Sequence, residues 1–443
     1  MNTGGLAVML GIQLRTGWKA MLAWVLALGA TMVATTTSIS GLYGTQRKID
    51  SYAAAVGSGD ALMAINGRIY GIDTLGGVVA NEFGFVASFA LPLMGISLIA
   101  RSTRRDEESG RLEIVLAGRI GRTAPLVAAA LVAAAALLLT SAALAAGLVA
   151  VGVPVTGSIV YAASLGALGF CFAGIAAVAA QVVQYGRGVY AAGLAALVLA
   201  YLLRGAGDVL DNFLTWLSPL GWAEEARAFG DPRWWPVLMA LAVGLALLVV
   251  AAGLSGARDL GDALLRRGAS APVASGLLRS PTGFAVALHR GAVVGWSIGA
   301  IVVSAVFGAL AQQLIDAMAG NESLADALGG SADADGFLAM SVLLLALISG
   351  GYAVQAVGTL RAEESTGRLE PVLAGAVDRR RWLLVHLCTM LTGLVVVAFL
   401  GALALGIAAA WSTGDASETG RLVAAVASYL PAILVLDGVA LLA

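Results

Sequence analysis

Residues 105–122 read RDEESGRLEIVLAGRIGR, and residues 361–379 read RAEESTGRLEPVLAGAVDR. The chain therefore carries one charged segment twice, about 256 residues apart, and each copy lies between two long apolar runs. An internal repeat constrains the whole architecture, because each copy marks the same joint in a repeated unit. The repeat predicts two similar halves, each with the same polar joint between two membrane spans.

The composition around the repeat is that of a membrane protein. Hydrophobic residues make up 59% of the 443 residues, charged residues 12%, and the mean hydropathy is +0.90. Nearly uncharged stretches recur, each long enough to cross about 30 Å of hydrocarbon as a helix. Helices pair their backbone groups internally where water is absent, and weak alternation argues against a β-barrel. We therefore expect an all-α polytopic membrane protein.

The hydropathy pattern predicts ten spans in two tandem halves. The spans lie near residues 20–44, 83–101, 125–151, 157–183, 187–204, 235–255, 290–312, 337–358, 382–411 and 421–443. The first half, residues 1–256, holds six spans, a cytoplasmic linker covers 257–273, and the second half, 274–443, holds four. Because the halves resemble each other, we expect the second to be incomplete by two spans, through truncation or because those spans are unresolved.

The basic residues predict a cytoplasmic amino terminus in the plasma (inner) membrane. With that orientation, 19 of the 26 Lys and Arg residues fall in cytoplasmic segments, as the positive-inside rule requires. Each half also opens with a short basic stretch, GLAVMLGIQLRTGWKAMLAW in the first and GLLRSPTGFAVALHRGAVVGW in the second. Such a stretch is either a separate elbow helix in the membrane interface or an extension of the span.

Each copy of the charged segment predicts an amphipathic helix on the membrane surface. Apolar residues recur at helical spacing, namely Leu112, Val115, Leu116 and Ile120 in one copy and Leu369, Val372, Leu373 and Val377 in the other. The opposite face carries paired acids and an arginine. A plain positive-inside loop needs basic residues but not a repeated Glu-Glu and Gly-Arg-Leu-Glu. The repetition therefore favours docking of a soluble partner, whose register such charges would set.

The motif E-E-x-G-R-L-E-x-V-L-A-G, between the second and third spans of a six-span unit, resembles the coupling segment of actinobacterial ABC-2-type permeases. In particular, the chain resembles the fused permeases known as exporters of polyketide antibiotics, over essentially its whole length and including LSPLGWAEEARAFGDPRWWP at 217–236. This implies two six-span halves of the type V exporter kind in one polypeptide. The missing spans are the chief departure from that pattern.

The resemblance also implies a partner and a set of contact residues. In that family, the helix between spans two and three fits into a cleft of a separate ATP-binding subunit, so two copies of one soluble ABC ATPase, a homodimer carrying ATP and Mg, are expected. The implied ATPase-coupling residues are Glu107, Glu108, Gly110, Arg111, Leu112, Glu113, Glu363, Glu364, Gly367, Arg368, Leu369 and Glu370. The additional Thr366 means that the two Glu-Glu pairs need not lie identically. The turn at 184–187 matches a smaller second contact.

The sequence itself holds no motif for ATP hydrolysis and predicts no catalytic residue, metal site or cofactor. A phosphate-binding G-x-x-x-x-G-K-[ST] loop is absent. The two histidines, His289 and His386, fall at span ends, where an interfacial anchor is the simplest interpretation. Cys171 and Cys388 fall inside spans and are expected to be packing residues.

The transport pathway and its outer gate are less clearly marked. Asp437 is an acid inside a predicted span, either in the pathway or hydrated near the span end. Phe83, Phe85 and Phe89 either line the cavity or pack within it. Outside the membrane, Pro219, Gly221 and Trp222 mark a short gating cap, whereas tryptophans there are also typical membrane anchors.

Together these features predict the membrane-spanning permease of an ATP-driven exporter, which moves hydrophobic drugs or antibiotics by alternating access and binds no nucleic acid. The alternatives are a secondary, ion-coupled transporter, a lipid or metabolite exporter, or a non-transporting scaffold that uses the same ATPase.

Overall fold

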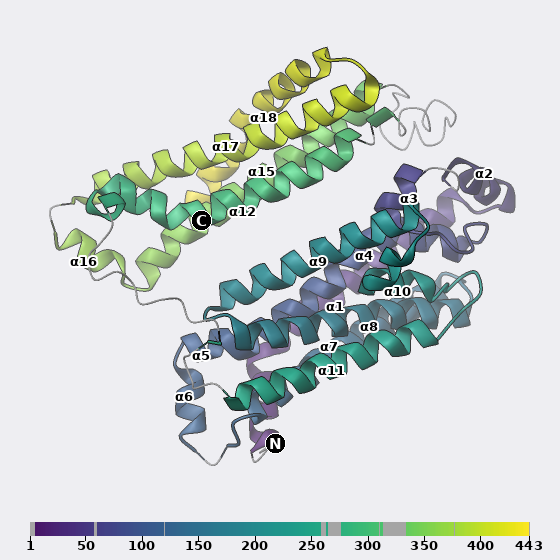
Figure 1. Ribbon diagram of the computed structural model, residues 1–443, viewed down its shortest axis with the longest axis horizontal. Helices are drawn as coiled ribbons and strands as arrows, with labels where there is room; N and C mark the ends of the chain where they lie inside the picture. The colour runs from purple at the N-terminus through teal and green to yellow at the C-terminus, as the bar shows by residue number, and fades with distance from the viewer. Residues whose placement is uncertain are drawn as a thin grey trace. The chain divides into compact units, whose positions relative to one another are not determined.

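The computed structural model describes residues 5–56, 60–118, 120–257, 263–264, 276–309, 311–312, 334–375 and 377–442. Over these residues the chain is helical without a strand, and ten helices are long and apolar enough to cross a membrane. The prediction of an all-α polytopic membrane protein is confirmed. The chain divides into two compact units, Met1–Gly268 and Ala269–Ala443 (Figure 1).

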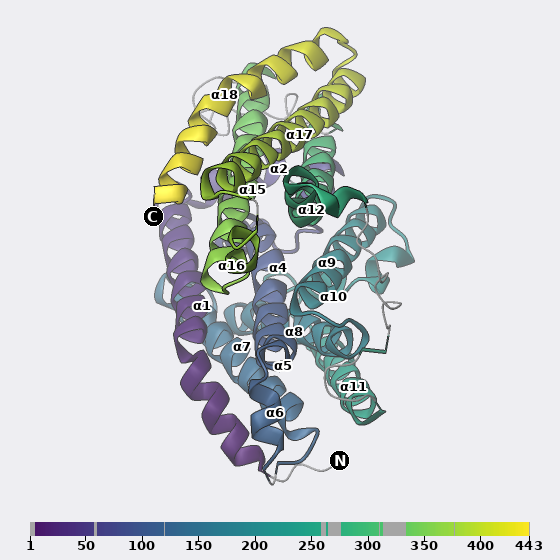
Figure 2. The same ribbon diagram turned by 90° about the vertical axis from the view of Figure 1, so that its left-hand side faces the viewer.

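The described part of the first unit contains six long helices, with α8 in contact with four of the others. Its long helices are α1 (Leu6–Leu42), α4 (Leu75–Ala100), α7 (Ala124–Ala150), α8 (Val155–Val182), α9 (Gly186–Val209) and α11 (Trp235–Ala257). Helix α8 contacts α4, α7, α9 and α11 (Figure 2). A β-carbon added at Gly95 of α4 would lie 2.2 Å from the carbonyl oxygen of Gly169 in α8. Glycine at this crossing therefore lets the two backbones approach closely, as in other membrane helix pairs.

Short elements occupy both ends of the first unit. One end holds α2 (Gln46–Val56), α3 (Asp60–Asn66), the 3-10 helix η2 (Phe213–Leu217) and α10 (Pro219–Glu225). The other end holds the start of α1, a π-helical turn η1 (Arg101–Arg105), α5 (Asp106–Glu108) and α6 (Arg111–Leu116). Helix α1 is continuous over 37 residues. The basic stretch is thus an extension of the span, and no break separates an elbow helix from it.

The second unit consists of four long helices and two short ones. They are η3 (Gly276–Arg279), α12 (Pro281–Ala309), α15 (Ala334–Ser365), α16 (Leu369–Leu373), α17 (Arg379–Thr413) and α18 (Ser417–Leu442). Helix α17 begins where the Asp378 carboxylate accepts a 2.7 Å hydrogen bond from the amide of Arg381, which caps the helix. Helix α12 is continuous too and packs mainly on α17. Most of the predicted linker lies outside the described residues, as does the side chain of Asp437 on α18.

Candidate functional site

The two copies of the charged segment adopt the same backbone turn. Helix α5 ends at Gly110, which has φ +72°, and helix α15 is followed by Gly367, which has φ +73°. The amide of each glycine donates a hydrogen bond to the carbonyl three residues earlier, at 3.0 Å in the first copy and 3.1 Å in the second. A left-handed glycine ends a helix, so the expectation that the paired glutamates share one helix with the apolar stripe is wrong. Each copy is a helix end, a glycine turn and a short helix.

The short helices α6 and α16 direct their apolar stripes inward. Val115 and Ile120 pack with Met9 and Ala124 at the start of α1 and α7. In the second unit Leu369 is 5% exposed and packs in the core cluster that Val372 and Leu373 also contact. Ile114, on the opposite face of α6, is 79% exposed. The stripe therefore fastens each short helix to its unit, and the opposite face remains accessible.

The first glutamate of each Glu-Glu pair is buried. The side chain of Glu107 is 5% exposed and lies 3.2 Å from Arg104, and the side chain of Glu363 is 9% exposed and lies 2.8 Å from Arg368. These two carboxylates thus hold the segment together internally and do not lie on an accessible face. Sequence reasoning had placed both on the partner-facing surface.

Different arginines neutralise the two equivalent glutamates, and the sequence explains why. Where the first copy has Arg104, the second has Leu360. Because that cation is missing, Arg368 turns back across the glycine turn to Glu363. Its counterpart Arg111 instead pairs with Asp106 at 3.2 Å. The two joints are therefore alike in backbone but not in charge pairing.

The second glutamate of each pair fixes the joint to a neighbouring helix. Glu108 Oε1 accepts a 2.7 Å hydrogen bond from the amide of Gly186, the first residue of α9. This bond ties the turn at 184–187 to the first joint. In the second unit Glu364 pairs with Arg379, the first residue of α17. The exposed side chains of the two joints include Arg111, Glu113, Ile114, Arg368 and Glu370, and Glu108 and Glu364 are exposed as well.

The phenylalanines of α4 lie on two faces of that helix. Phe83 is 1% exposed and belongs to the core of the first unit. Phe85 and Phe89 are partly exposed and contact Tyr201 of α9, with ring centroids 6.2 and 5.1 Å from its ring. None of the three lines the cavity described below. Phe85 and Phe89 therefore join α4 to α9, and Phe83 packs in the core.

The segment predicted as an outer cap is the short helix α10. It begins at Pro219, in the first helical position where proline is favoured, and the Ser218 hydroxyl anchors its start by donating to the Ala200 carbonyl at 2.7 Å. Gly221 lies against η2, where an added β-carbon would be 2.2 Å from the Thr215 carbonyl oxygen. The indole of Trp222 donates to the Trp216 carbonyl at 2.7 Å.

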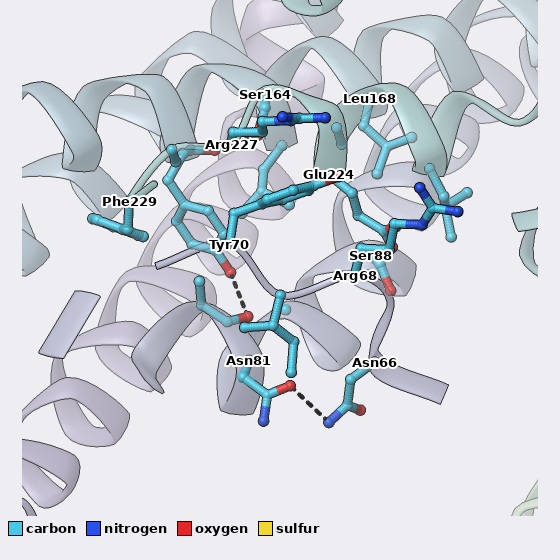
Figure 3. Close-up of a pocket in the computed structure, with 18 of the residues that line it drawn as sticks. Asn66, Arg68, Tyr70, Asn81, Ser88, Ser164, Leu168, Glu224, Arg227 and Phe229 are labelled. Atoms are coloured by element: carbon cyan, nitrogen blue, oxygen red, sulfur yellow. Dashed lines mark hydrogen bonds between the residues drawn. The ribbon is translucent and has the colours of Figure 1, made fainter. Parts of the chain in front are cut away.

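A cavity of about 90 Å³ lies beneath α10, between α4, α8, α9 and the segment after α3. Its lining includes Asn66, Arg68, Asn81, Arg204, Glu224 and Arg227. Figure 3 shows Asn66, Arg68, Asn81, Glu224 and Arg227 around the cavity. Asn66 donates a hydrogen bond to Asn81 at 3.0 Å. The cavity is thus more polar than its position among membrane helices would lead one to expect.

Two residues that line this cavity, Arg204 and Glu224, belong to a charged cluster with Asp208. Arg204 Nε lies 3.3 Å from Glu224 Oε1, and Arg204 Nη1 lies 3.8 Å from Asp208 Oδ2. Arg204 and Asp208 are 1% and 2% exposed. Burial raises the pKa of the Glu224 carboxyl well above its ordinary value, against the opposing effect of Arg204. Charges buried at this depth are costly unless paired, and they mark functional positions in membrane helices.

Beside the cluster, a further ion pair joins Glu225, at the end of α10, to Arg227. Arg227 Nη2 lies 2.8 Å from Glu225 Oε2, and the Tyr70 hydroxyl donates to Glu225 Oε1 at 2.6 Å. Burial and this hydrogen bond raise the pKa of Tyr70 to about 12.

Sequence reasoning missed the cluster because it ended the fifth span at residue 204. Helix α9 continues to Val209, so Asp208 lies inside the membrane helix one turn after Arg204. The spacing of an arginine and an aspartate four residues apart was the available signal, because such residues face each other on a helix.

The two histidines and the two cysteines also occupy unexpected or contrasting positions. His289 and His386 are each 1% exposed, and Nε2 of the first lies 3.3 Å from Nδ1 of the second. They form a buried contact between α12 and α17, so the prediction that they are interfacial anchors is wrong.

Cys171 is buried, whereas Cys388 is exposed on α17. Among the described residues no group of three or more metal-ligating side chains was found.

Comparison with known proteins identifies relatives. The family model described as "Multidrug efflux system permease Rv1217c, C-terminal domain" matches residues 278–443. The multidrug efflux system permease protein Rv1217c of Mycobacterium tuberculosis is 33% identical over 443 residues, and the alignment covers 99% of this chain and 80% of the relative. The similarity therefore spans both units.

Proposed function

This chain belongs to the family of the multidrug efflux system permease Rv1217c, and on that premise we propose that it is the membrane-spanning permease of an ATP-driven exporter of hydrophobic compounds. Two soluble ABC ATPase subunits would bind ATP and Mg and dock on the two charged joints. Their closure would move the two units between inward-open and outward-open states. The chain would lie in the plasma membrane with its amino terminus in the cytoplasm.

The observation that carries this proposal is the repeated joint. Gly110 and Gly367 share a left-handed turn, and each is followed by a short helix whose apolar face is packed and whose polar face is accessible. A joint rigidly fastened to its membrane helices can pass a displacement to them. Two such joints on one chain suit a partner that is present in two copies.

The accessible charges tell which residues should be tested. Glu113 and Glu370 occupy equivalent positions on α6 and α16 and are exposed. Charge reversal at Glu108 and Glu364 would confuse docking with folding, because both residues hold internal contacts. The informative variant is therefore Glu113→Lys combined with Glu370→Lys.

The experiment is co-purification of the full chain with a Walker-type ATPase encoded by a neighbouring reading frame. The double variant should weaken association by about tenfold or more, since like charges in an interface cost at least 1–2 kcal/mol. The matched control is Asp73→Lys, an exposed acid at the opposite end of the first unit. Unchanged association in the double variant would remove the docking role.

A secondary transporter is the second candidate. The position of Asp208 within helix α9, a candidate membrane span, favours it. An acid inside a membrane helix is typical of proton relays and ion-coupled carriers. ATP-independent transport driven by a pH gradient would identify this mechanism.

A further inference from the structure

We propose that Asp208 and Glu224 form a proton-binding site beneath α10, and that a proton held between their carboxyl groups keeps α10 closed over the cavity. The site deepens the proposed function by giving the cap a chemical latch. It rests on the proposed orientation only for the side of the membrane from which the proton arrives.

The first argument is a count of charges around Arg204. Its guanidinium already donates to the Met63 carbonyl at 3.2 Å and to the Ile65 carbonyl at 2.8 Å. It nevertheless faces two carboxyl groups, one on its own helix and one on α10. If both carboxyl groups are ionised, the single positive charge of Arg204 neutralises only one of them, and one buried negative charge remains.

Arg68 gives Asp208 partial compensation from the other side. Its Nε lies 3.4 Å from Asp208 Oδ1, but its side chain is 25% exposed and it also pairs with the exposed Asp211. The Thr215 hydroxyl donates to the same Oδ1 at 2.9 Å. Both of these partners therefore approach Oδ1, whereas Arg204 Nη1 lies 3.8 Å from Oδ2.

The other oxygens have no hydrogen-bond donor. Asp208 Oδ2 and Glu224 Oε2 are both buried and both lack a hydrogen-bond partner, although both carboxyl groups face the same guanidinium, that of Arg204. An unsatisfied buried acceptor costs about 1–3 kcal/mol. A single proton between the two carboxyls turns one into a donor, satisfies both oxygens and neutralises the surplus charge.

The backbone of the turn after α3 lies directly against the Glu224 carboxyl. Gly67 has φ +91°, and a β-carbon there would lie 2.0 Å from Glu224 Oε1. The turn after α3 thus wraps the carboxyl closely. No other charge from the packed helices relieves it, because α8, α11 and η2 contain no Asp, Glu, Lys or Arg. Its neighbour Glu225 is already held by Arg227 and Tyr70.

The physical consequence is a latch. Burial and the nearby Asp208 raise the pKa of Glu224, whereas Arg204 lowers it. With the proton bound, Glu224 stays on Arg204 and α10 covers the cavity. Loss of the proton leaves two negative carboxylates facing each other in a low dielectric, and the repulsion drives α10 away from α9.

The test uses the full chain in an ester-free detergent and difference infrared spectroscopy during a pH titration. The carbonyl stretch of a protonated carboxylic acid should persist above the pH at which exposed carboxyl groups lose their protons, and disappear as the pH rises further. Glu224→Gln should lack this titrating band, while Glu418→Gln, which alters an ion pair with Arg421 in the second unit, should retain it. A wild-type band that Glu224→Gln leaves unchanged would overturn the proton site.

A second readout tests the latch. Trp222 lies on α10, so tryptophan emission should shift with the same midpoint as the infrared band. The shift should be lost in Glu224→Gln and in Trp222→Phe. A titrating band without an emission shift would overturn the latch. If Glu224→Gln does not fold, Asp208→Asn must abolish or displace the band. Neither readout includes an ATPase, so failure of the proposed exporter would leave both outcomes interpretable.

Discussion

His289 and His386 lie 97 residues apart in the sequence, yet their rings meet inside the second unit with a nitrogen–nitrogen distance of 3.3 Å. The contact joins α12 to α17. The remaining ring nitrogens, His289 Nδ1 and His386 Nε2, are buried without a hydrogen-bond partner. The pair is thus isolated from solvent, and each ring has the other as its hydrogen-bond partner.

We expect His289→Ala to destabilise the chain by about 1–3 kcal/mol, because it leaves the buried ring of His386 without its partner. Replacing both residues with Phe should restore part of this loss, since no polar group then stays buried. Thermal unfolding of the full chain in detergent measures both effects. Cys388→Ser, an exposed change on α17, serves as the control, and equal melting of His289→Ala and this control would contradict the prediction.

The glycine turns make a prediction that separates backbone strain from packing. Gly110→Ala and Gly367→Ala should each cost about 1–2 kcal/mol, the penalty of a left-handed conformation for an L-residue. Space is not limiting, because nothing lies within 4 Å of either added β-carbon. Gly291→Ala, in helix α12 and equally open, should instead stabilise by about 0.5–1 kcal/mol. Denaturation of the three variants tests the contrast, and a loss at Gly291 as large as at Gly110 would refute it.

The unequal charge pairing at the two joints predicts unequal sensitivity. Arg104→Met should destabilise the first unit by about 3 kcal/mol, because both Arg104 and Glu107 are buried. Arg368→Met should cost about 1 kcal/mol or less, because the Arg368 side chain is 59% exposed. Midpoints of thermal unfolding give the order. The reverse order would show that the two joints do not differ as described.

The ten candidate membrane helices could be predicted from the sequence because the hydropathy of a span is summed over about 20 residues. A single polar residue changes that sum little. The joints were harder. Their repeated letters revealed the duplication, and their spacing gave the inward stripe. The left-handed turns at Gly110 and Gly367 separate the paired glutamates from the helix that carries the stripe, however, and no sequence period predicts such a turn.

Contacts between distant helices could not be predicted in the same way. The pairing of His289 with His386, and of Glu224 with Arg204, depends on how helices cross, and neither carries a local motif. Asp208 was missed for a different reason. The fifth span was predicted to end at residue 204, whereas α9 ends at Val209, so Asp208 fell outside the predicted span. Boundary errors of this size are ordinary for sequence reasoning.

The cap makes a prediction about transport. Trp222→Ala removes the indole that donates to the Trp216 carbonyl and should reduce efflux several-fold at unchanged membrane abundance. Trp222→Phe keeps most of the ring packing and should retain more activity. Efflux of a fluorescent hydrophobic dye from cells, normalised to membrane abundance, measures this. Parallel loss of abundance and efflux would mean that Trp222 only anchors the chain.

The Glu224 carboxyl predicts how stability depends on pH. Its pKa is raised in the folded state, so the folded state binds the proton more tightly than the unfolded state does. The associated stability is present at low pH and is lost as the pH rises through the raised pKa. Glu224→Gln should flatten this dependence. Melting curves across the pH range test it, and equal slopes for the two proteins would contradict it.

The most direct test of the central claim is dye export by the chain in proteoliposomes, with and without the partner ATPase. Export should require ATP hydrolysis, persist when the proton gradient is collapsed, and fall in the Glu113→Lys/Glu370→Lys variant. Export by the chain alone, driven by an imposed pH gradient without ATP, would contradict it.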